Sequence, residues 1–495
     1  MKTRLPAFAA EHSATVFTHI PVVREVLADF DTPLSAYTKL CGERTGAFLL
    51  ESVQGGERWG RYSIIGLPAR REIRIYNGTW REFRDGEMVV ERACGQPLDA
   101  IREYLSAFRV QPVPGLPRFS GGLVGYFGAD LVRYIEPHLA PGRKPGNVDD
   151  VRLLLAEDIV VFDNLRGSAF MVALAETGDT AAMKNAAKRI GAMNVALQSP
   201  LPVVPTRQVR AGEFASSVGE KRFKTSVERI RDYIHEGDAM QVVLSHRMEA
   251  DFDGDALDVY RALRLLNPSP YLYFLDFGDL QIAGSSPEAL VRVEDNEVTV
   301  RPIAGTRKRG ATTADDQALE RELHADPKER AEHLMLIDLG RNDVGRISDI
   351  GSVKVTEQMV TERYSHVMHL VSNVTGKLRE DCDALDALAA CFPAGTLSGA
   401  PKLRALEIID ELEPEARGIY SGAVGYLGWQ GNLDTAIAIR TAIIRNGKLQ
   451  VQAGAGIVFD SDPDSEWEET LHKSRALREA MMMVANGMQL GGTDK

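Results

Sequence analysis

Apolar residues recur with two different periods in the second half of this 495-residue chain. In FKTSVERIRDYIHEGD, which starts at Phe223, they return every three or four residues and Gly237 follows, which predicts a helix ending at this glycine. QVVLSHRMEA, at 241–250, follows directly and predicts a strand. LDTAIAIRTAII, at 433–444, alternates strictly, which predicts a strand that carries Arg440 on a face of alanines.

Before residue 197 the pattern favours short strands. REIRIYNGTWREFRDGEMVVERA has β-like runs on both sides of Asn77-Gly78, which predicts a hairpin. Residues 197–217 contain three prolines and have no usable period, so we interpret them as a surface linker. The chain is thereby divided into an N-terminal region at 1–196, the linker at 197–217, a C-terminal region at 218–480 and a tail at 481–495.

One short motif occurs twice, as SGGLVGYFG from Ser120 and as SGAVGYLG from Ser421. Glycine-rich strand ends also recur by chance. The repetition is a weak indication of equivalent hairpins, one in each region.

Composition limits the classes of function. With 44% hydrophobic and 26% charged residues, the chain is typical of a soluble globular protein of two or more lobes. A net charge of −12 and the lack of a basic cluster interleaved with aromatic residues argue against nucleic acid as a partner. No segment reaches about 18 consecutive apolar residues, so we expect no membrane span. The cysteines have no metal or redox spacing, which is typical of reduced thiols in a cytoplasmic protein: Cys41, Cys94, Cys382 and Cys391.

Two pairs of glutamates share a spacing that places both members on one helical face. SEWEETLHKS contains Glu466 and Glu469, with Lys473 on the same face, and DPKERAEHLMLIDLGRND contains Glu329 and Glu332. A single pair is most often a solvated acidic surface. Two pairs on separate helices would suit Mg²⁺, which takes a few carboxylates and fills its octahedron with water and substrate.

Three segments rich in small residues could approach an anion with their backbone. RPIAGTRKRG places Gly305 and Thr306 in a turn amid four basic residues, FPAGTLSGAPK is a small-residue loop, and VQAGAGIVF is a strand with Gly454 and Gly456. None of the three is a P-loop or a dinucleotide fingerprint. Arg440 could grip a carboxylate, although a structural ion pair is equally common for such an arginine.

Six collinear motifs resemble a known family. PIAGTRKRG, ERAEHLMLIDLGRNDVGR, YSHVMHLVSNV, FPAGTLSGAPK, IYSGAVGY and GAGIVFDSDPDSEWEETLHKS closely resemble the chorismate-utilising enzymes, specifically the anthranilate synthase component I family, over about 28–480. The resemblance implies an α+β fold, with two antiparallel β-sheets packed as a sandwich, helices outside and an active site opening between lobes. It also implies that 218–480 is the chorismate-binding catalytic region.

The resemblance assigns the two glutamate pairs to a Mg²⁺ site, as ligands directly or through water: Glu329, Glu332, Glu466 and Glu469. Mg²⁺ would hold the ring carboxylate of chorismate, and Arg440 its enolpyruvyl carboxylate. The positions similar to the family's substrate contacts are Gly305, Thr306, Thr396, Tyr420, Arg440, Gly454, Gly456 and Lys473.

The implied reaction is that of a lyase with two steps. Ammonia adds at C2 of chorismate while the C4 hydroxyl leaves, and Glu288 matches the family's general acid, which a neighbouring acidic site would keep protonated. The C2 proton is then removed and pyruvate expelled to give anthranilate. His369 matches the histidine of this stage, whereas His333 and His366 do not.

Two positions separate the chain from related enzymes. Isochorismate and salicylate synthases carry a basic lysine where this sequence has Gln241, and aminodeoxychorismate synthases carry a lysine nucleophile where it has Ala304. A 2-amino-2-deoxyisochorismate synthase that stops after the first step is not excluded by the motifs. A non-catalytic aromatic-ligand sensor on the same scaffold is the alternative from another class of protein.

The resemblance further implies one partner and one inhibitor. None of the four cysteines lies in a G-x-C-x-G nucleophile turn, so a separate glutamine amidotransferase subunit, component II of the synthase, would supply ammonia. Two segments, LLES and NPSPYLYF, resemble a tryptophan feedback site. The residues concerned are Glu51, Ser52, Asn267, Pro268, Pro270 and Tyr271. The alternative is a buried strand end that packs on a turn between the lobes.

Overall fold

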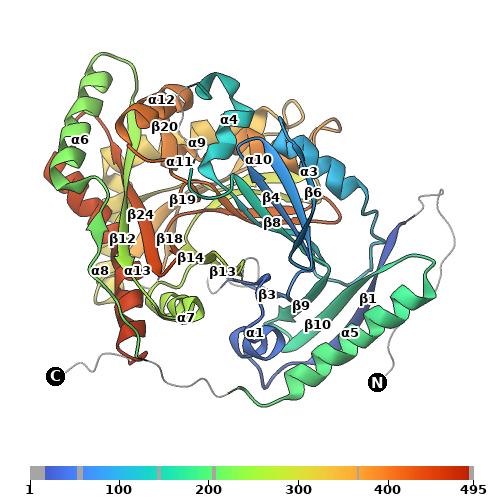
Figure 1. The fold of residues 1–495 in the computed structure, drawn as a ribbon. Helices are drawn as coiled ribbons and strands as arrows, with labels where there is room; N and C mark the ends of the chain where they lie inside the picture. Colours follow the sequence, from blue (N-terminus) through green and yellow to red (C-terminus); the bar gives the residue numbers. More distant parts are fainter. Residues whose placement is uncertain (1–16, 53–59, 142–145, 203–207, 365–366, 490–495) are drawn as a thin grey trace.

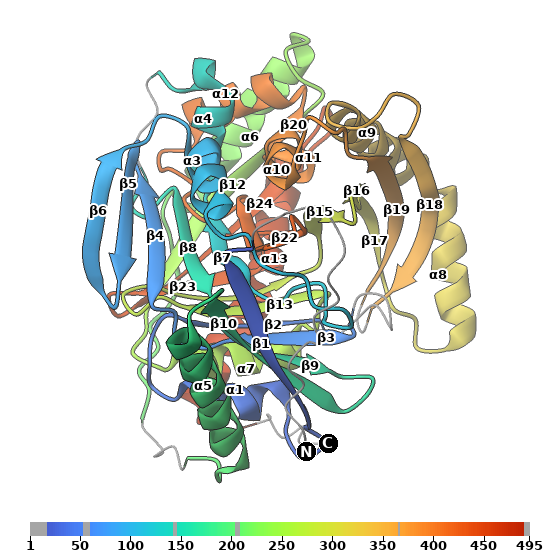
Figure 2. The ribbon, with the colours of Figure 1, turned by 90° about the vertical axis from the view of Figure 1, so that its right-hand side faces the viewer.

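The computed structural model describes residues 17–52, 60–141, 146–202, 208–364 and 367–489. Two large antiparallel sheets lie face to face, and helices cover their outer faces (Figures 1 and 2). This confirms the predicted α+β sandwich. None of the helices in the described ranges is both long and apolar enough to cross a membrane.

The first sheet, sheet A, has the order β1-β10-β9-β3-β2-β13-β14-β23-β24-β12-β11, and β20 pairs with β12 beside this path. Its strands are β1 (His19–Leu27), β2 (Ala47–Glu51), β3 (Tyr62–Gly66), β9 (Asp158–Asp163), β10 (Ser168–Glu176), β11 (Ala215–Ser216), β12 (Gln241–Asp251), β13 (Tyr271–Asp276), β14 (Gln281–Ser286), β20 (Gly399–Ala400), β23 (Thr441–Arg445) and β24 (Lys448–Ile457).

The second sheet, sheet B, has the order β17-β19-β16-β15-β22-β21-β7-β8-β4-β5-β6, and β18 pairs with β19. Its strands are β4 (Arg71–Tyr76), β5 (Thr79–Arg84), β6 (Glu87–Ala93), β7 (Gly122–Phe127), β8 (Val151–Ala156), β15 (Ala289–Glu294), β16 (Glu297–Val300), β17 (Ile303–Lys308), β18 (Lys354–Arg363), β19 (Val367–Lys377), β21 (Ala423–Gly428) and β22 (Leu433–Ile437).

Both sheets repeat their strand order on the two sides of a centre. Outward from the β2/β13 pair, sheet A reads β2, β3, β9, β10, β1 on one side and β13, β14, β23, β24, β12 on the other. Outward from the β7/β21 pair, sheet B reads β7, β8, β4, β5 and β21, β22, β15, β16. The chain therefore builds one strand arrangement twice, first with the residues before the linker and again with those after it.

The repeated glycine motif lies at the centre of sheet B. Strands β7 and β21 pair directly with each other, and Gly125 lies opposite Gly425. A Cβ on Gly125 would come 2.0 Å from the carbonyl oxygen of Arg152, and one on Gly425 would come 2.0 Å from that of Asp434. The motif thus marks equivalent strands of the two halves, since β7 pairs with β8 and β21 pairs with β22. These two pairs also lie next to each other at the centre of the sheet.

Three apolar layers hold the sandwich together. One fills the space between the sheets and includes Phe48 and Tyr273 from sheet A and Val124 and Leu154 from sheet B. The other two lie under helices on the outer faces. The helices are α1 (Pro33–Cys41), α3 (Pro97–Ser106), α4 (Val132–Ile135), α5 (Thr180–Gln198), α6 (Gly219–His235), α7 (Ala256–Leu266), α8 (Thr313–Ala325), α9 (Pro327–Gly345), α10 (Ala384–Cys391), α11 (Gly395–Ser398), α12 (Lys402–Leu412) and α13 (Pro463–Ala485), with two 3-10 turns at Ala129–Leu131 and Pro137–Leu139.

The local predictions before the linker and around it have clear outcomes. Asn77 and Gly78 have positive φ values of 45° and 72°, so the predicted hairpin turn is confirmed. Gly237 also has a positive φ, 86°, directly after the end of α6, which confirms the predicted helix end. A second turn of the same kind, after β5, adds β6 to the hairpin and gives three strands.

The predicted boundaries of the linker and the tail differ from the secondary structure. Helix α5 continues to Gln198, and Ala215–Ser216 add a short strand to β12. Helix α13 continues to Ala485 because its apolar stripe goes on through Met481 and Val484, which are buried. The predicted tail at 481–495 therefore begins inside the helix, and the wider division into regions stays a prediction.

Candidate active site

Helices α9 and α13 begin in the same way and carry the two glutamate pairs. Each has an aspartate N-cap followed by proline, Asp326 before α9 and Asp462 before α13. Their first turns are therefore fixed, and Glu329 and Glu466 lie in those turns, where the helix dipole stabilises a negative charge.

The glutamates of the two helices interact electrostatically. Burial raises the pKa of Glu332, Gln241 opposes this through a hydrogen bond, and Glu329 on the same helix and Glu469 on α13 add to the increase. Burial also raises the pKa of Glu466, with a further contribution from Glu469. The two pairs thus form one acidic site built from two helices far apart in sequence.

All four glutamates have partners within the protein, and that of Glu466 is Ser461. Arg307 Nη1 lies 3.0 Å from Glu329 Oε1, Lys473 Nζ lies 2.7 Å from Glu469 Oε1, and Gln241 Nε2 donates to Glu332 Oε1 over 3.2 Å. Within the described residues, no three acidic, histidine or cysteine side chains come close enough together to hold a metal ion. The hard oxygen donors and their mutual repulsion fit Mg²⁺ chemically, but in this state they accept from protein donors.

Glu288 lies in the turn between β14 and β15, and its residue is only 8% exposed. Thr396 Oγ1, from α11, donates to both carboxylate oxygens, at 3.2 and 3.3 Å. Burial raises the pKa of Glu288 to about 8, whereas Thr396, Arg440 and Lys473 act in the opposite direction. The expected cause of protonation, a neighbouring acidic site, is wrong, because desolvation is what raises the pKa of Glu288.

Arg440 does not lie in a continuous strand. The chain leaves sheet B at the end of β22 and enters sheet A at β23, and Arg440 lies in this crossing with a positive φ of 49°. The predicted alternating strand over 433–444 is therefore wrong, because the alternation spans two strands of different sheets. Within the described part of the chain, Arg440 forms no ion pair with a carboxylate, and its Nη1 donates over 3.4 Å to Asn267 Oδ1.

His369 is buried on β19 and faces the strand that carries Gly305. Its Nδ1 lies 3.0 Å from the carbonyl oxygen of Gly305 and 3.0 Å from Thr306 Oγ1. Burial lowers the pKa of His369, so the ring is neutral near pH 7. Because a carbonyl oxygen only accepts, Nδ1 carries the proton and Nε2 has the free lone pair. His333 instead bonds to Ser372 inside the core, and His366 lies outside the described residues.

Glycines around the site make room for side chains. Gly305 has a φ of +67° at an irregularity in the pairing of β17 with β19, so the predicted turn there is a bulged strand. A Cβ on Gly454 would lie 2.9 Å from Tyr420 Oη, and one on Gly456 would lie 2.7 Å from Gln241 Nε2. Lys473 Nζ donates to the carbonyl oxygen of Gly454 over 2.9 Å, so α13 lies close to the end of β24.

The three arginines beside Gly305 are all engaged in ion pairs. Arg301 pairs with Glu357 and Glu362. Arg307 pairs with Glu322, Asp326 and Glu329, and Arg309 pairs with Asp316. The cations that act on Glu288 are Arg440 and Lys473, and both lower its pKa.

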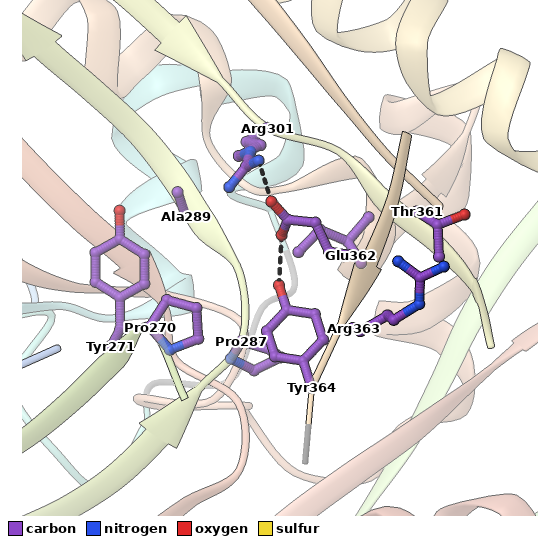
Figure 3. Close-up of a pocket in the computed structure, with 10 residues that line it drawn as sticks. Pro270, Tyr271, Pro287, Ala289, Arg301, Thr361, Glu362, Arg363 and Tyr364 are labelled. Carbon is purple, nitrogen blue, oxygen red and sulfur yellow. Dashed lines mark hydrogen bonds and ion pairs between the residues drawn. The ribbon is translucent and has the colours of Figure 1, made fainter. Parts of the chain in front are cut away.

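A cavity of about 430 Å³ lies next to the β14/β15 turn (Figure 3). Glu288 itself lines a separate small hollow together with Thr396. Pro287 and Ala289, on either side of the acid, contribute to its wall, as does Tyr364, whose ring packs edge-on against His369 at 5.5 Å. Tyr364 Oη donates to Glu362 over 2.8 Å, and Arg301 pairs with the same carboxylate (Figure 3). The cavity is thus lined by the chain neighbours of Glu288 and by a ring that contacts His369, whereas the side chains of Glu288 and His369 are not part of its wall.

Several contacts at the site were not expected from the sequence. They are Gln241 with Glu332, Asn267 with Arg440, and Tyr364 with His369. Only Gln241 had a signal in the sequence, as the position where relatives carry lysine. The other two depend on which strands become neighbours, and no local pattern records that.

The two segments of the predicted tryptophan site lie side by side. Strand β2 pairs with β13, and Glu51 lies opposite Leu272. Glu51 is buried, pairs with Arg264 at 3.2 Å and accepts from Tyr260 Oη at 2.5 Å. Tyr271 Oη donates to Asp434 over 2.9 Å. The remaining members of the set, Ser52, Asn267, Pro268 and Pro270, directly follow β2 or precede β13.

Comparisons with known proteins agree with this architecture. The sequence profile of the chorismate binding enzyme family matches residues 48–479. The chain belongs to this family.

Relatives within the family narrow the assignment. The anthranilate synthase component 1 of Pseudomonas aeruginosa is 54% identical over 96% of this chain and 98% of its own, and that of Neisseria meningitidis serogroup B is 51% identical over 96% and 98%. The crystal structure of anthranilate synthase component I from Streptococcus pneumoniae superposes with a TM-score of 0.75 at 38% identity, over 91% of this chain and 98% of that one. Within the family, the chain groups with the anthranilate synthase component 1 enzymes.

A more distant structure shares only the fold. The menaquinone-specific isochorismate synthase of Escherichia coli has a TM-score of 0.69 at 20% identity, over 94% of this chain and 96% of that one.

Proposed function

We propose that this enzyme converts chorismate and ammonia to anthranilate and pyruvate, the first step of tryptophan biosynthesis. The observation that carries the proposal is that three groups interact in one site. Arg440 has no carboxylate partner among the described residues, burial raises the pKa of Glu288 to about 8, and His369 is neutral near pH 7. Arg440 acts electrostatically on both of the others. A cation, an acid and a base on one site match a dicarboxylate substrate that must first gain and then lose a proton.

Arg440 and Lys473 hold the substrate in this scheme. A guanidinium can bind the enolpyruvyl carboxylate with two hydrogen bonds, and chorismate would replace the long hydrogen bond to Asn267. Tyr420, Thr396 and the glycines around β17 and β24 form the walls. The four glutamates would hold Mg²⁺, which when bound neutralises the ring carboxylate that they would otherwise repel. Glu329 and Glu469 must leave Arg307 and Lys473 to do so.

Glu288 acts first in the proposed reaction. Ammonia adds at C2 of chorismate, the ring double bond shifts, and the C4 hydroxyl leaves as water with the proton of Glu288. His369 acts second, since its free Nε2 can accept the C2 proton. The bond between the ring and the enolpyruvyl oxygen then breaks as the ring becomes aromatic, and the enolpyruvate that leaves takes up a proton at its methylene carbon to become pyruvate.

Ammonia comes from a separate glutamine amidotransferase subunit in this proposal. None of the four cysteines lies in a G-x-C-x-G turn, and Cys41, Cys94 and Cys391 are buried. All four cysteines are free thiols, which agrees with a location in the reducing cytoplasm.

The reaction is tested by the fluorescence of anthranilate. The purified chain should form anthranilate from chorismate, ammonium and Mg²⁺, and should form none when glutamine replaces ammonium. A non-aromatic amino product would instead identify a synthase that stops after amination. No turnover would favour a ligand sensor, and glutamine-dependent turnover would contradict the need for a partner.

We further propose that tryptophan binds beside the β2/β13 pair. Asn267 could connect this place to the active site, because it accepts a hydrogen bond from Arg440 and donates one to Ser285 Oγ over 3.1 Å. A ligand that moves the turn before β13 would move Asn267 and so Arg440. Ser52→Phe should relieve inhibition by tryptophan and leave uninhibited turnover within about twofold. Wild-type activity that is indifferent to millimolar tryptophan would contradict the proposal.

A further inference from the structure

His246 is a buried imidazole that the proposed reaction does not use. It lies on β12, and its ring contacts the rings of Phe223 from α6 and Trp467 from α13. Helices α6 and α13 lie next to each other against β12 and β24 (Figure 1). The imidazole therefore lies where sheet A meets both helices, and α13 is the helix that carries Glu466 and Glu469.

Both nitrogens of this ring have a hydroxyl as their hydrogen-bond partner. Nδ1 of His246 lies 2.9 Å from Ser216 Oγ, at the end of β11, and Nε2 lies 2.8 Å from Thr470 Oγ1, in α13. Burial lowers the pKa of His246 to about 4, so the ring is neutral near pH 7. A neutral imidazole has one donor nitrogen and one acceptor nitrogen, so the two hydroxyls must differ in their roles.

The other contacts of the two hydroxyls select one tautomer. Thr470 Oγ1 donates its hydrogen to the carbonyl oxygen of Trp467 over 2.7 Å, so it accepts from the ring and Nε2 carries the proton. Ser216 Oγ accepts from the backbone N–H of Gly219 over 3.1 Å, so its own hydrogen is available to Nδ1. One chain of hydrogen bonds, all pointing in the same direction, thus connects the first turn of α6 with α13 through His246.

The contacts of His246 determine how α13 is rotated about its axis. Trp467 stacks on the imidazole with ring centroids 4.7 Å apart and an interplanar angle of 22°, and Thr470 accepts from Nε2. These two residues directly follow Glu466 and Glu469 in the sequence. Successive residues of a helix are about 100° apart, so holding Trp467 and Thr470 against the ring turns both glutamates to the adjoining face. The electrostatic action of Glu469 on α9 indicates that this face is directed toward α9.

We propose that His246 is a positioning residue for the two-helix acidic site, a role that rests on the Mg²⁺ site of the proposed function. Its ring fixes the rotation of α13 so that Glu466 and Glu469 point toward α9 before the cation binds. Because the carboxylates repel one another, a helix free to rotate would carry them apart, and Mg²⁺ would have to bring them together again. An orientation that is already fixed lowers this cost of binding.

The proposal is tested by direct binding of Mn²⁺ in place of Mg²⁺, with the free Mn²⁺ measured by electron paramagnetic resonance on the full chain with chorismate and without ammonia. His246→Phe keeps a ring and loses both hydrogen bonds, and Thr470→Val loses only the hydroxyl. Each should weaken Mn²⁺ binding about tenfold, the lower end of the effects of outer-shell partners on metal affinity. His246→Gln should recover most of the affinity, because its amide can donate from the position of Nε2.

The kinetic assay of the same variants separates positioning from a merely structural role. The Mg²⁺ concentration that gives half-maximal turnover should rise with the loss of Mn²⁺ affinity, whereas kcat at saturating Mg²⁺ should stay within about twofold. Ser216→Ala is the matched control, because it removes the hydrogen bond on the other side of the ring and leaves the contact with Thr470. Its Mn²⁺ affinity should equal that of the wild type, even where thermal unfolding shows that the Ser216 and Thr470 variants are equally destabilised.

Three results would overturn the proposal. They are wild-type Mn²⁺ affinity in His246→Phe, an equal loss of affinity in the Ser216 and Thr470 variants, and a proton on Nδ1 of His246 in the nitrogen NMR spectrum of histidine-labelled protein. A wild-type chain that binds no Mn²⁺ would contradict the metal site of the proposed function and this proposal with it. Failure of the positioning role alone is therefore distinguishable, because the wild type would then still bind Mn²⁺ and form anthranilate.

Discussion

Helices α5 and α13 occupy corresponding places in the two halves of the molecule, each directly after the strand on which it packs (Figure 1). Helix α5 contains no aspartate or glutamate. Its Arg189 pairs with Asp158 at the crossing from sheet B to sheet A and donates to the carbonyl oxygen of Leu174. Helix α13 carries Glu466, Glu469 and Lys473, and the corresponding crossing contains Arg440 without a carboxylate partner in the described ranges.

The difference shows that the repeated strand order determines the fold but does not by itself determine the chemistry. The duplicated strand order provides two corresponding crossings from sheet B to sheet A. In the first one, Arg189 forms an ion pair with Asp158. In the second half, the chain between β16 and β21 adds α8, α9, β17–β19 and α10–α12 to the repeated strands (Figure 2). These additions contribute Glu329, Glu332, His369 and Thr396. The active site therefore requires the additional elements as well as the repeated scaffold.

The largest effect is expected at Glu288. Glu288→Gln keeps the shape but cannot release a proton, so kcat for anthranilate formation should fall about 10²- to 10⁴-fold. Thermal unfolding should be unchanged or shifted upward, since a buried ionisable group is removed. The measurement is initial rate by anthranilate fluorescence, with Glu157→Gln, at the first-half crossing that corresponds to that of Arg440, as the control. A variant with more than a tenth of wild-type kcat would exclude Glu288 as the acid.

The second effect concerns the two-helix acidic site. Glu332→Gln should lower kcat/KM roughly a hundredfold at low Mg²⁺, because the variant loses a charged oxygen donor. Raising Mg²⁺ should recover part of the loss. Glu468→Gln, next to Glu469 but exposed, is the matched control and should behave like wild type. Identical Mg²⁺ dependence of the Glu332 and Glu468 variants would remove Glu332 from the proposed ligands.

A smaller effect is expected from pH. Glu288 has a pKa raised to about 8, so its proton-donating form decreases as the pH rises through that value. At a fixed concentration of free ammonia, kcat should fall about tenfold per unit above pH 8. Burial lowers the pKa of His369, so its ring stays unprotonated and able to accept a proton across this range. A profile that stays flat to pH 9.5 would show that no acid of this pKa limits the reaction, and Glu288→Gln should lack the alkaline limb.

The smallest effect on catalysis is expected in α5. Ile190 is 3% exposed, and Ile190→Ala should lower the free energy of unfolding by about 2–5 kcal/mol through the cavity it leaves. At 15 °C the folded fraction should keep wild-type kcat and KM, because α5 contributes no group to the chemistry. Differential scanning fluorimetry and the fluorescence assay on one sample check both points. A large loss of kcat without unfolding would mean that the packing of α5 in the first half affects the active site in the second half.

Local sequence was sufficient where a signal is complete within a few residues. The turn at Asn77-Gly78 and the end of α6 at Gly237 were predicted because a positive φ selects particular residues. The spacing of Glu329 with Glu332 and of Glu466 with Glu469 placed each pair on one helical face, since helical periodicity is fixed by the backbone. The family motifs added the fold class and the proposal that Glu288 is the general acid.

Only the tertiary structure decided how these pieces act together. The alternation around Arg440 suggested one strand, but the chain changes sheets there, because a period of two continues unbroken through a crossing. The three arginines and the lysine of RPIAGTRKRG suggested free positive charge, yet all three arginines are used in ion pairs. Arg301 and Arg307 pair with residues that are distant in sequence, and Arg309 pairs with the nearby Asp316. The proton of Glu288 depends on burial by segments such as α11, and desolvation is a property of the packed state that no local pattern contains.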